Sequence, residues 1–284
     1  MDLSEVRQAA GQSGWDAKLS LAYARRDART VLARREHFGP LRVQRNLYPE
    51  GAGTCHSIVL HPPGGIAGGD SLAMDIEVGA EAAALLTTPG AGKWYRSAGR
   101  AASQVLHFEV GENASLEWLP LETILFDGAD ARLQCRVQLA TGGQYLGWEI
   151  LCFGRQASGE IFATGSIRID NEIWQEDRCL WRERGGIDGS DPLFDSPVGL
   201  AGRKISATLV AAGRDVAPQD VAACREVPAG PGALAGITRL PKVLIARWLG
   251  NDSEDAKRYL TALWTLLRPA LRNLPAHRPR IWAT

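Results

Sequence analysis

The amino-acid sequence predicts a mainly β protein with many short strands and a small helical layer. Three observations support this fold class. Apolar and polar residues alternate with a period of two in many segments, Gly-rich turns separate these segments, and a clear helical pattern is confined to the last third of the chain. With 284 residues, of which 45% are hydrophobic, the chain has enough apolar material for a sizeable core.

The alternating segments are predicted to be strands. The cleanest alternation covers residues 131–139, where small or apolar residues alternate with Arg and Gln, as in a strand with one buried face. Residues 15–23 and 72–78 follow the same pattern. Weaker patterns predict further strands over residues 30–38, 41–48, 57–61, 82–88, 104–110, 115–119, 145–153, 161–169 and 172–181.

The last third of the chain mixes strands with helices. Strands are predicted over residues 207–212, 233–239 and 242–249, with a short helix over residues 218–226. A long amphipathic helix is predicted over residues 253–268, because its apolar residues recur at the i, i+3, i+4, i+7 spacing of one helix face.

The ends of this long helix are also signalled. Asp252 or Ser253 can cap the first turn, and the acidic Glu254 and Asp255 complement the positive end of the helix dipole. Pro269 marks the point at which the regular pattern weakens.

The predicted organisation is a single domain over residues 1–284. A β body covers residues 14–183, a Gly/Pro-rich, charged loop covers residues 184–203, and a C-terminal layer of βαββα type covers residues 204–284. No internal repeat is evident, so the sequence period itself does not indicate a solenoid.

Charge and cysteine content narrow the class of protein. The 32 basic and 32 acidic residues balance, which argues against nucleic acid or an anionic membrane as a partner. Residues 1–14 lack an apolar signal segment, and every apolar run is too short to span a bilayer, so the predicted location is the cytoplasm. The five cysteines include no Cys-x-x-Cys pair and are expected to be free thiols.

Residues 61–70, which read His-Pro-Pro-Gly-Gly-Ile-Ala-Gly-Gly-Asp, are predicted to form a rigid loop that presents Asp70. Phosphate binding is one interpretation of such a loop. However, Gly64 to Gly69 has Ile66 where a dinucleotide fingerprint needs glycine, and residues 87–94 lack the first glycine and the hydroxyl of a Walker A motif. A nucleotide or phosphoester enzyme therefore remains only an alternative.

Cys55, His56 and His61 are the candidate metal ligands. On one strand, however, Cys55 and His56 point to opposite faces, and Cys55 lies about 20 Å from His61 at roughly 3.3 Å per residue. These three side chains alone therefore cannot chelate one ion, and a buried cysteine with hydrogen-bonded histidines is the structural alternative.

Two carboxylates stand out by their sequence context. Glu149 lies inside an apolar strand and must be paired, hydrated or ligating, and Glu160 follows the turn at 155–159. Arg155 and Arg168 are possible ion-pair partners. The other interpretation is a water-filled internal passage lined by Asp70 and Glu149.

Signatures of catalysis are not evident, since there is no Gly-x-Ser-x-Gly elbow and no His-Glu-x-x-His helix. Residues 116–126 and 279–282 carry aromatic and apolar side chains typical of interface anchors, although core packing explains each residue singly.

Several motifs together resemble the UreD-type (UreH-type) urease accessory proteins, and they appear in family order over nearly the whole chain. They are Gly39-Pro40-Leu41, Val43-Gln44-Arg45, Tyr48-Pro49-Glu50-Gly51, residues 61–70, Thr87-Thr88-Pro89-Gly90, Lys93, Tyr95-Arg96-Ser97, Leu116-Glu117-Trp118-Leu119-Pro120, Gly154-Arg155, Gly159-Glu160 and Pro279-Arg280-Ile281-Trp282. Leu121 and Trp94 depart from the common pattern.

The resemblance implies a β-helix-like body and a scaffold that is not an enzyme. It implies that the chain joins UreF and the GTPase UreG, docks on apo-urease and helps to insert nickel, which is transient cargo rather than a tightly bound cofactor. An internal nickel path lined partly by acidic residues is also implied, and a purely structural docking module is the alternative. The candidate path residues are Asp70, Glu149 and His61, followed by Glu160, Cys55 and His56.

Overall fold

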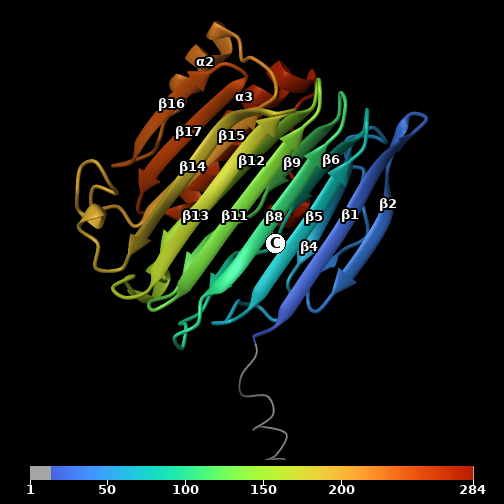
Figure 1. Cartoon of the computed structure of the whole chain (residues 1–284). Coiled ribbons are helices and arrows are strands. Elements are labelled where there is room, and N and C mark those ends of the chain that lie inside the picture. The colour runs from blue at the N-terminus through green and yellow to red at the C-terminus, as the bar shows by residue number, and fades with distance from the viewer. Residues whose placement is uncertain (1–13, 284) are drawn as a thin grey trace, which may run out of the picture.

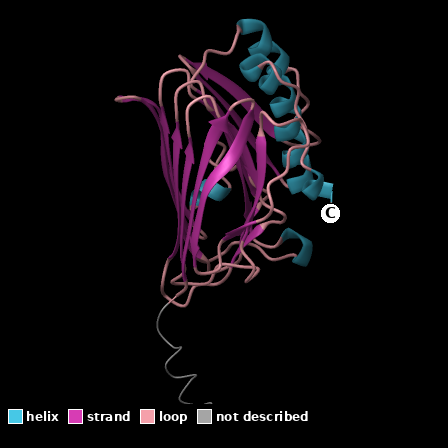
Figure 2. Ribbon diagram, turned by 90° about the vertical axis from the view of Figure 1, so that its right-hand side faces the viewer, coloured by secondary structure: helices cyan, strands magenta, loops and turns pink. Residues whose placement is uncertain are grey.

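The computed structural model describes residues 14–283, and they form two β-sheets packed face to face with helices outside one of them (Figure 1, Figure 2). The seven-stranded sheet has, in spatial order, β14 (Arg178–Asp188), β13 (Ser166–Gln175), β11 (Asp130–Leu139), β8 (Ala102–Val110), β5 (Ser71–Val78), β1 (Asp16–Arg26) and β2 (Arg29–Phe38). The segment predicted to lack a signal sequence covers residues 1–14, and residues 1–13 of it lie outside the described residues.

The ten-stranded sheet lies between the seven-stranded sheet and the helices α2 (Pro218–Arg225) and α3 (Ser253–Arg272). Its main path is β16 (Leu234–Leu240), β17 (Val243–Gly250), β15 (Ile205–Ala212), β12 (Gln144–Phe153), β9 (Ser115–Leu119), β6 (Ala83–Thr87), β4 (Cys55–Leu60) and β3 (Arg42–Val43). The short strands β7 (Gly92–Trp94) and β10 (Thr123–Leu125) pair beside β12, and 3-10 turns cover Gln156–Ser158, Pro192–Phe194 and Arg280–Ala283.

The chain winds between the two sheets as in a β-solenoid. It passes from β4 to β5, from β6 to β8, from β9 to β11 and from β12 to β13, crossing to the other sheet each time. Each strand pairs in parallel with the equivalent strand of the turn before. The predicted β-helix-like fold is therefore confirmed, although the sequence shows no visible repeat.

Antiparallel strands close both ends of this winding. β2 pairs with β1 at one end, and β14, β15, β17 and β16 complete the sheets at the other. The order strand, helix, strand, strand, helix predicted for the C-terminal layer is observed, but its three strands belong to the ten-stranded sheet.

Three predicted strands have the wrong boundaries. The predicted strands over residues 161–169 and 172–181 are instead β13 and β14, so the loop predicted from residue 184 begins after Asp188. Asp127 holds residues 163–164 in a loop by accepting hydrogen bonds from their backbone N–H groups, and Glu176 makes the turn with φ of 52°. The strand predicted over residues 41–48 is reduced to β3.

Two apolar cores hold the three layers together. The first lies between the sheets and is built from alternate residues of each strand, such as Leu19, Phe108 and Trp118. The second lies between the ten-stranded sheet and the helices, where Trp148 packs against Trp264. β12 contributes to both cores, because its successive side chains point to opposite faces.

Helix α3 begins as predicted but extends beyond Pro269 to Arg272. The Asp252 side chain caps it by accepting hydrogen bonds from the backbone N–H groups of Glu254 and Asp255. The last turn stays helical because Leu271 is buried and the Arg272 side chain is tied to the sheet. No helix in the described part of the chain is long and apolar enough to cross a membrane.

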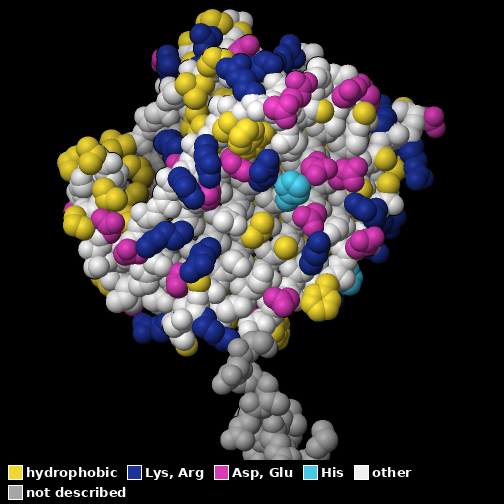
Figure 3. Space-filling view, viewed as in Figure 1, with side chains coloured by type: hydrophobic (Ala, Val, Ile, Leu, Met, Phe, Trp, Pro, Cys, Tyr) yellow, Lys and Arg dark blue, Asp and Glu magenta, His cyan; other side chains and the backbone are white. Residues whose placement is uncertain are grey.

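The outer face of the seven-stranded sheet is polar and bears both signs of charge (Figure 3). Cross-strand ion pairs such as Lys18–Asp75 and Arg182–Asp170 lie on neighbouring strands of this sheet. Interspersed charges of this kind keep a sheet surface soluble and create no large field of one sign.

Candidate functional site

The interior between the sheets becomes polar toward the edge formed by β14. Leu106, Cys135, Asn171 and Glu183 are paired in register across β8, β11, β13 and β14, and all four belong to the inward-facing set of their strands. The row therefore changes from an apolar side chain to a thiol, then an amide, then a carboxylate as it approaches the edge.

A second polar row faces the first from the ten-stranded sheet. Glu149, Thr208 and Arg247 are in register across β12, β15 and β17. The Arg247 guanidinium donates to the Thr208 hydroxyl, and its Nη2 lies 2.6 Å from Oε1 of Glu183 on the opposite sheet. Among the described residues, this is the one ion pair that joins the two sheets.

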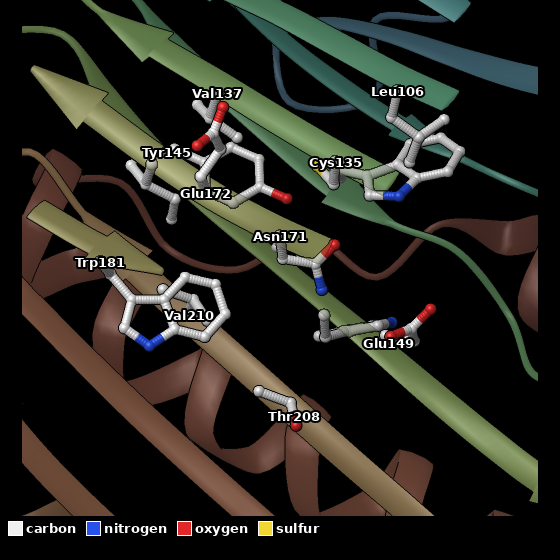
Figure 4. Close-up of a pocket in the computed structure, with 14 residues that line it drawn as sticks. Leu106, Cys135, Val137, Tyr145, Glu149, Asn171, Glu172, Trp181, Thr208 and Val210 are labelled. Atoms are coloured by element: carbon white, nitrogen blue, oxygen red, sulfur yellow. The ribbon is translucent and has the colours of Figure 1, made fainter. Parts of the chain in front are cut away.

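A cavity of about 70 Å³ lies inside this edge ion pair, between the sheets. Figure 4 shows Glu149, Asn171 and Thr208 around it, with Trp181 and Cys135 on its walls. A water molecule needs roughly 10–15 Å³ of such volume, so the cavity has room for several. We call it the interlayer cavity.

Glu149 is the central charge of the interlayer cavity. Its carboxylate has no hydrogen bond or ion pair among residues 14–283, although the side chain keeps some solvent accessibility. Burial, and then the nearby Glu183, raises the pKa of Glu149 to about 7. The Glu149 carboxyl group therefore gains or loses its proton near neutral pH.

The two arginines predicted as partners of Glu149 are used elsewhere. Arg155 pairs with Glu160, and Arg168 pairs with Asp188. Arg155 lies in the loop after β12, the strand that carries Glu149, and Arg168 lies on β13 of the other sheet. The ion-pair interpretation of Glu149 is therefore wrong, and hydration or transient ligation remains.

The donor set of the interlayer cavity is weak for nickel. Burial and the Glu149 charge raise the pKa of the Cys135 thiol to about 12, so it stays protonated at neutral pH. Burial also raises the pKa of the neighbouring Tyr145 hydroxyl. The remaining donors are oxygens of carboxylate, amide and hydroxyl groups, which bind late first-row ions less tightly than imidazole or thiolate.

The Gly-rich segment of residues 61–70 forms a loop as predicted, but the Asp70 side chain faces its own loop. The Asp70 carboxylate accepts hydrogen bonds of 2.8 Å from the backbone N–H groups of Trp15 and Ala67. Gly64 and Gly69 adopt positive φ values of 80° and 94° to make the turns. Asp70 thus ties the loop to the start of β1 and does not line the interlayer cavity.

His61 lies near Asp70, at the start of the same loop. Burial lowers the pKa of His61, and the Asp70 charge acts in the opposite direction. The structure therefore brings these two predicted path residues together, while Glu149 stands apart in the interlayer cavity. Their place on a nickel path stays a prediction.

The remaining predicted site residues have structural partners. Cys55 is buried in the core between the sheets, and burial raises its pKa. The neighbouring His56 points to the helical side, where its Nε2 lies 2.6 Å from Oε1 of Glu50, and the predicted opposite orientation of the two residues is confirmed. Glu160 makes a two-pronged ion pair with Arg155 in an exposed loop.

The sequence patterns did not predict a buried network of charged side chains between β9 and α3. Glu117 on β9 accepts hydrogen bonds from Arg268, Arg272 and the Trp264 indole, all on α3. Arg268 is fully buried and also donates to Glu50, linking the helix to the segment before β4. Glu117 carried the same signal as Glu149, a carboxylate inside an apolar strand, and Arg268 lies on the predicted apolar helix face.

This network sets the ionisation of Glu50. Burial alone would raise the pKa of Glu50, but the hydrogen bonds from His56 and Arg268 lower it to about 2. Glu50 is therefore negatively charged at neutral pH.

The Gly-rich segments do not have the geometry of phosphate-binding loops. Residues 61–70 lead into strand β5, and Gly92-Lys93 lies within strand β7. Phosphate loops place the anion at the start of a helix, where free backbone N–H groups converge. The Thr87 hydroxyl, at the end of β6, instead donates to the carbonyl of Leu119 and accepts from the Trp282 indole.

The fold and the site define a β-solenoid protein with a cavity between its sheets that holds the carboxylate of Glu149. Within the described residues, no group of three or more His, Cys, Asp or Glu side chains is placed to hold a metal ion tightly. A sequence model of the UreD urease accessory proteins matches residues 16–283. The chain belongs to the UreD family of urease accessory proteins.

Several relatives carry the name urease accessory protein UreD. The protein of Dechloromonas aromatica (strain RCB) is 52% identical over 282 residues, covering 98% of each chain. That of Azoarcus sp. (strain BH72) is 52% identical over 275 residues, covering 97% of this chain and 96% of the relative. The protein of Pseudomonas aeruginosa PAO1 is 49% identical over 272 residues, covering 95% of both.

Proposed function

We propose that this protein acts in urease maturation as a cytoplasmic scaffold that passes nickel toward the urease active site. Membership of the UreD family supports the role in maturation. In this proposal the scaffold joins UreF and UreG partners and docks on apo-urease, and nickel is cargo that never rests in a tight site. The unpartnered Glu149 carboxylate in the interlayer cavity is the observation that carries the metal path.

The chemistry of the cavity favours brief occupancy. A hydrated divalent cation is attracted by Glu149 and can exchange water for the amide and hydroxyl oxygens of Asn171 and Thr208. The protonated Cys135 thiol does not compete as a strong ligand. A site of this kind releases the ion readily, as a relay requires.

Arg247 is the neutralising charge at the edge of this path. Its guanidinium occupies the space beside Glu183 that a cation would otherwise share with that carboxylate. The edge is closed to cations while the pair is intact, and it becomes acidic when the arginine swings into solvent, where about half of its side chain already lies.

The substitution Glu149→Gln tests the proposal. It keeps the shape of the side chain but removes the negative charge, so urease matured with this variant should contain less than half the normal nickel. Nickel per urease is measured by mass spectrometry after co-expression with the urease and accessory proteins. Glu77→Gln, on the outer face of β5, is the matched control and should give normal nickel.

Co-purification with UreF-type and UreG-type partners and with urease separates assembly from metal transfer. Equal recovery of the complex with Glu149→Gln and low nickel supports the path. Equal recovery with normal nickel would refute the path and leave a purely structural docking module. Saturable GTP binding by the isolated chain would instead favour the nucleotide alternative.

A further inference from the structure

Strand β16 is a sheet edge that pairs on one side only, with β17, among the described residues. Of the four strands that end the main paths of the two sheets, β2 and β14 carry several charged residues and a register irregularity, and β3 has only two residues. These features discourage pairing with other chains. β16 has seven residues, a single charge at Arg239 and no proline, and six of its positions are exposed.

The backbone direction of β16 can be read from one hydrogen bond. Arg225 on α2 donates to the carbonyl oxygen of Ile237 at 3.4 Å, so this carbonyl points away from β17. In an antiparallel ladder, the N–H and C=O of one residue point to the same neighbour, and successive residues alternate. Ala235, Ile237 and Arg239 therefore direct their backbone groups to the open side, with Arg225 as an exposed, displaceable cover.

We propose that β16 pairs antiparallel with β16 of a second copy of this chain, about a two-fold axis at Ile237. This register places Ile237 opposite its own equivalent and Ala235 opposite Arg239, and each such pair can exchange two hydrogen bonds. Leu234 and Leu240, which are 48% and 40% exposed, also fall opposite each other.

The sequence of β16 is self-complementary in this register. Leucine stands three positions before and three positions after Ile237, the small Gly236 opposes Thr238, and the arginine never opposes its own equivalent. An isologous interface of this kind closes as a dimer instead of growing into a fibre. The area involved is that of one strand pair, so the dimer is expected to be weak and concentration-dependent.

Opposite charges at Ala235 test the register. Ala235 is exposed in the monomer. In the dimer, Ala235→Lys places a lysine opposite Arg239 of the other copy at two symmetric positions, and Ala235→Glu places a glutamate at the same two positions, where it can form ion pairs. Cross-strand charge pairs contribute modestly, so the dimer dissociation constant of the full chain should rise about fivefold in the first variant and fall about fivefold in the second. Sedimentation velocity measures both constants.

Cross-linking in cells is a second measurement that needs no purification. In a Cys179→Ser background, which removes the exposed native thiol, Ile237→Cys should form a disulfide-linked dimer under mild oxidation, and Thr238→Cys should do so much more slowly. Equal cross-linking of the two variants, or shifts of the same sign for the two Ala235 variants, would overturn the self-pairing. The proposal would also be overturned if the Ala235 variants changed only the amount of a different protein that co-purifies with the chain. In that case β16 would pair with that other protein.

Discussion

Glu149 owes its properties to the register of two sheets that the sequence does not reveal. The sequence identified a carboxylate that needed a partner. Among residues 14–283 no side chain forms a hydrogen bond or ion pair with it, and the nearby charge is a second carboxylate, Glu183. Arg155 and Arg168 are close in sequence, but their positions in a loop and on the opposite sheet direct them to other acids. Side-chain direction after a loop cannot be read from periodicity.

The raised pKa of Glu149 predicts a pH-dependent stability. Between the ordinary value of 4.5 and the folded value of about 7, the folded chain binds a proton that the unfolded chain releases. The free energy of unfolding should therefore fall with rising pH in this range, by about 3 kcal/mol from this group, and stay level above it. The measurement is urea denaturation of the parent and Glu149→Gln chains from pH 5 to pH 8.

The parent should lose stability relative to Glu149→Gln as pH rises. Glu183→Gln should move the midpoint of that loss downward, because it removes the neighbouring negative charge. A stability difference that is independent of pH would contradict the shift.

Asp70 illustrates the opposite case. The glycines and prolines of residues 61–70 predict a loop, and a loop is observed, since their dihedral preferences are local. Which way Asp70 points depends on Trp15, which lies 55 residues earlier in the chain. A function for Asp70 therefore has to be tested with variants whose folding is checked first.

At the scale of elements, helix α3 is joined to the sheet by charge as well as by its apolar face. The apolar spacing predicted the helix and its buried side, and the Asp252 cap fixed its start. The end was misplaced because Pro269 is tolerated when Arg268 and Arg272 hold the final turn against Glu117. Tertiary contacts overrode a local signal.

Arg268→Ala should strongly destabilise the protein. Removing the buried guanidinium takes one of two arginine partners from Glu117 and the arginine partner from Glu50, and breaking a buried ion pair in this way costs about 3–5 kcal/mol. Chemical denaturation monitored by the fluorescence of Trp264 and Trp148 measures the loss. Arg258→Ala, on the exposed side of the same helix, is the matched control and should change stability by less than about 0.5 kcal/mol.

Strands with one buried face were predicted well, and strands of only two or three residues were predicted poorly. Alternation predicted β1, β5 and β11, whose inward positions are nearly all apolar. β7 and β10 have three residues each and carry no periodic signal. Their existence depends on the neighbouring β12, a long-range effect.

At the scale of the whole molecule, the solenoid arises without a sequence repeat. Each turn buries alternate residues from a different mixture of side chains, so the backbone repeats while the sequence does not. The family resemblance predicted this architecture, whereas composition and periodicity predicted only a β-rich chain.

Hydrogen exchange should follow the layers. Amides of β9, whose five residues are all buried in the middle layer, should exchange slowest, and those of β16 fastest among the long strands of that sheet. The measurement is exchange detected by mass spectrometry at low protein concentration, where β16 is unpaired. Protection of β16 equal to that of β9 under these conditions would contradict the expected gradient.

The charge network of Glu117 also has a consequence for biosynthesis. Arg268 follows Glu117 by 151 residues, so a ribosome working at about 5–20 residues per second needs roughly 8–30 s to supply it. During that interval the nascent middle layer presents an uncompensated carboxylate and an uncovered apolar surface. The growing chain is thus expected to depend on a holding chaperone until translation of α3 is complete.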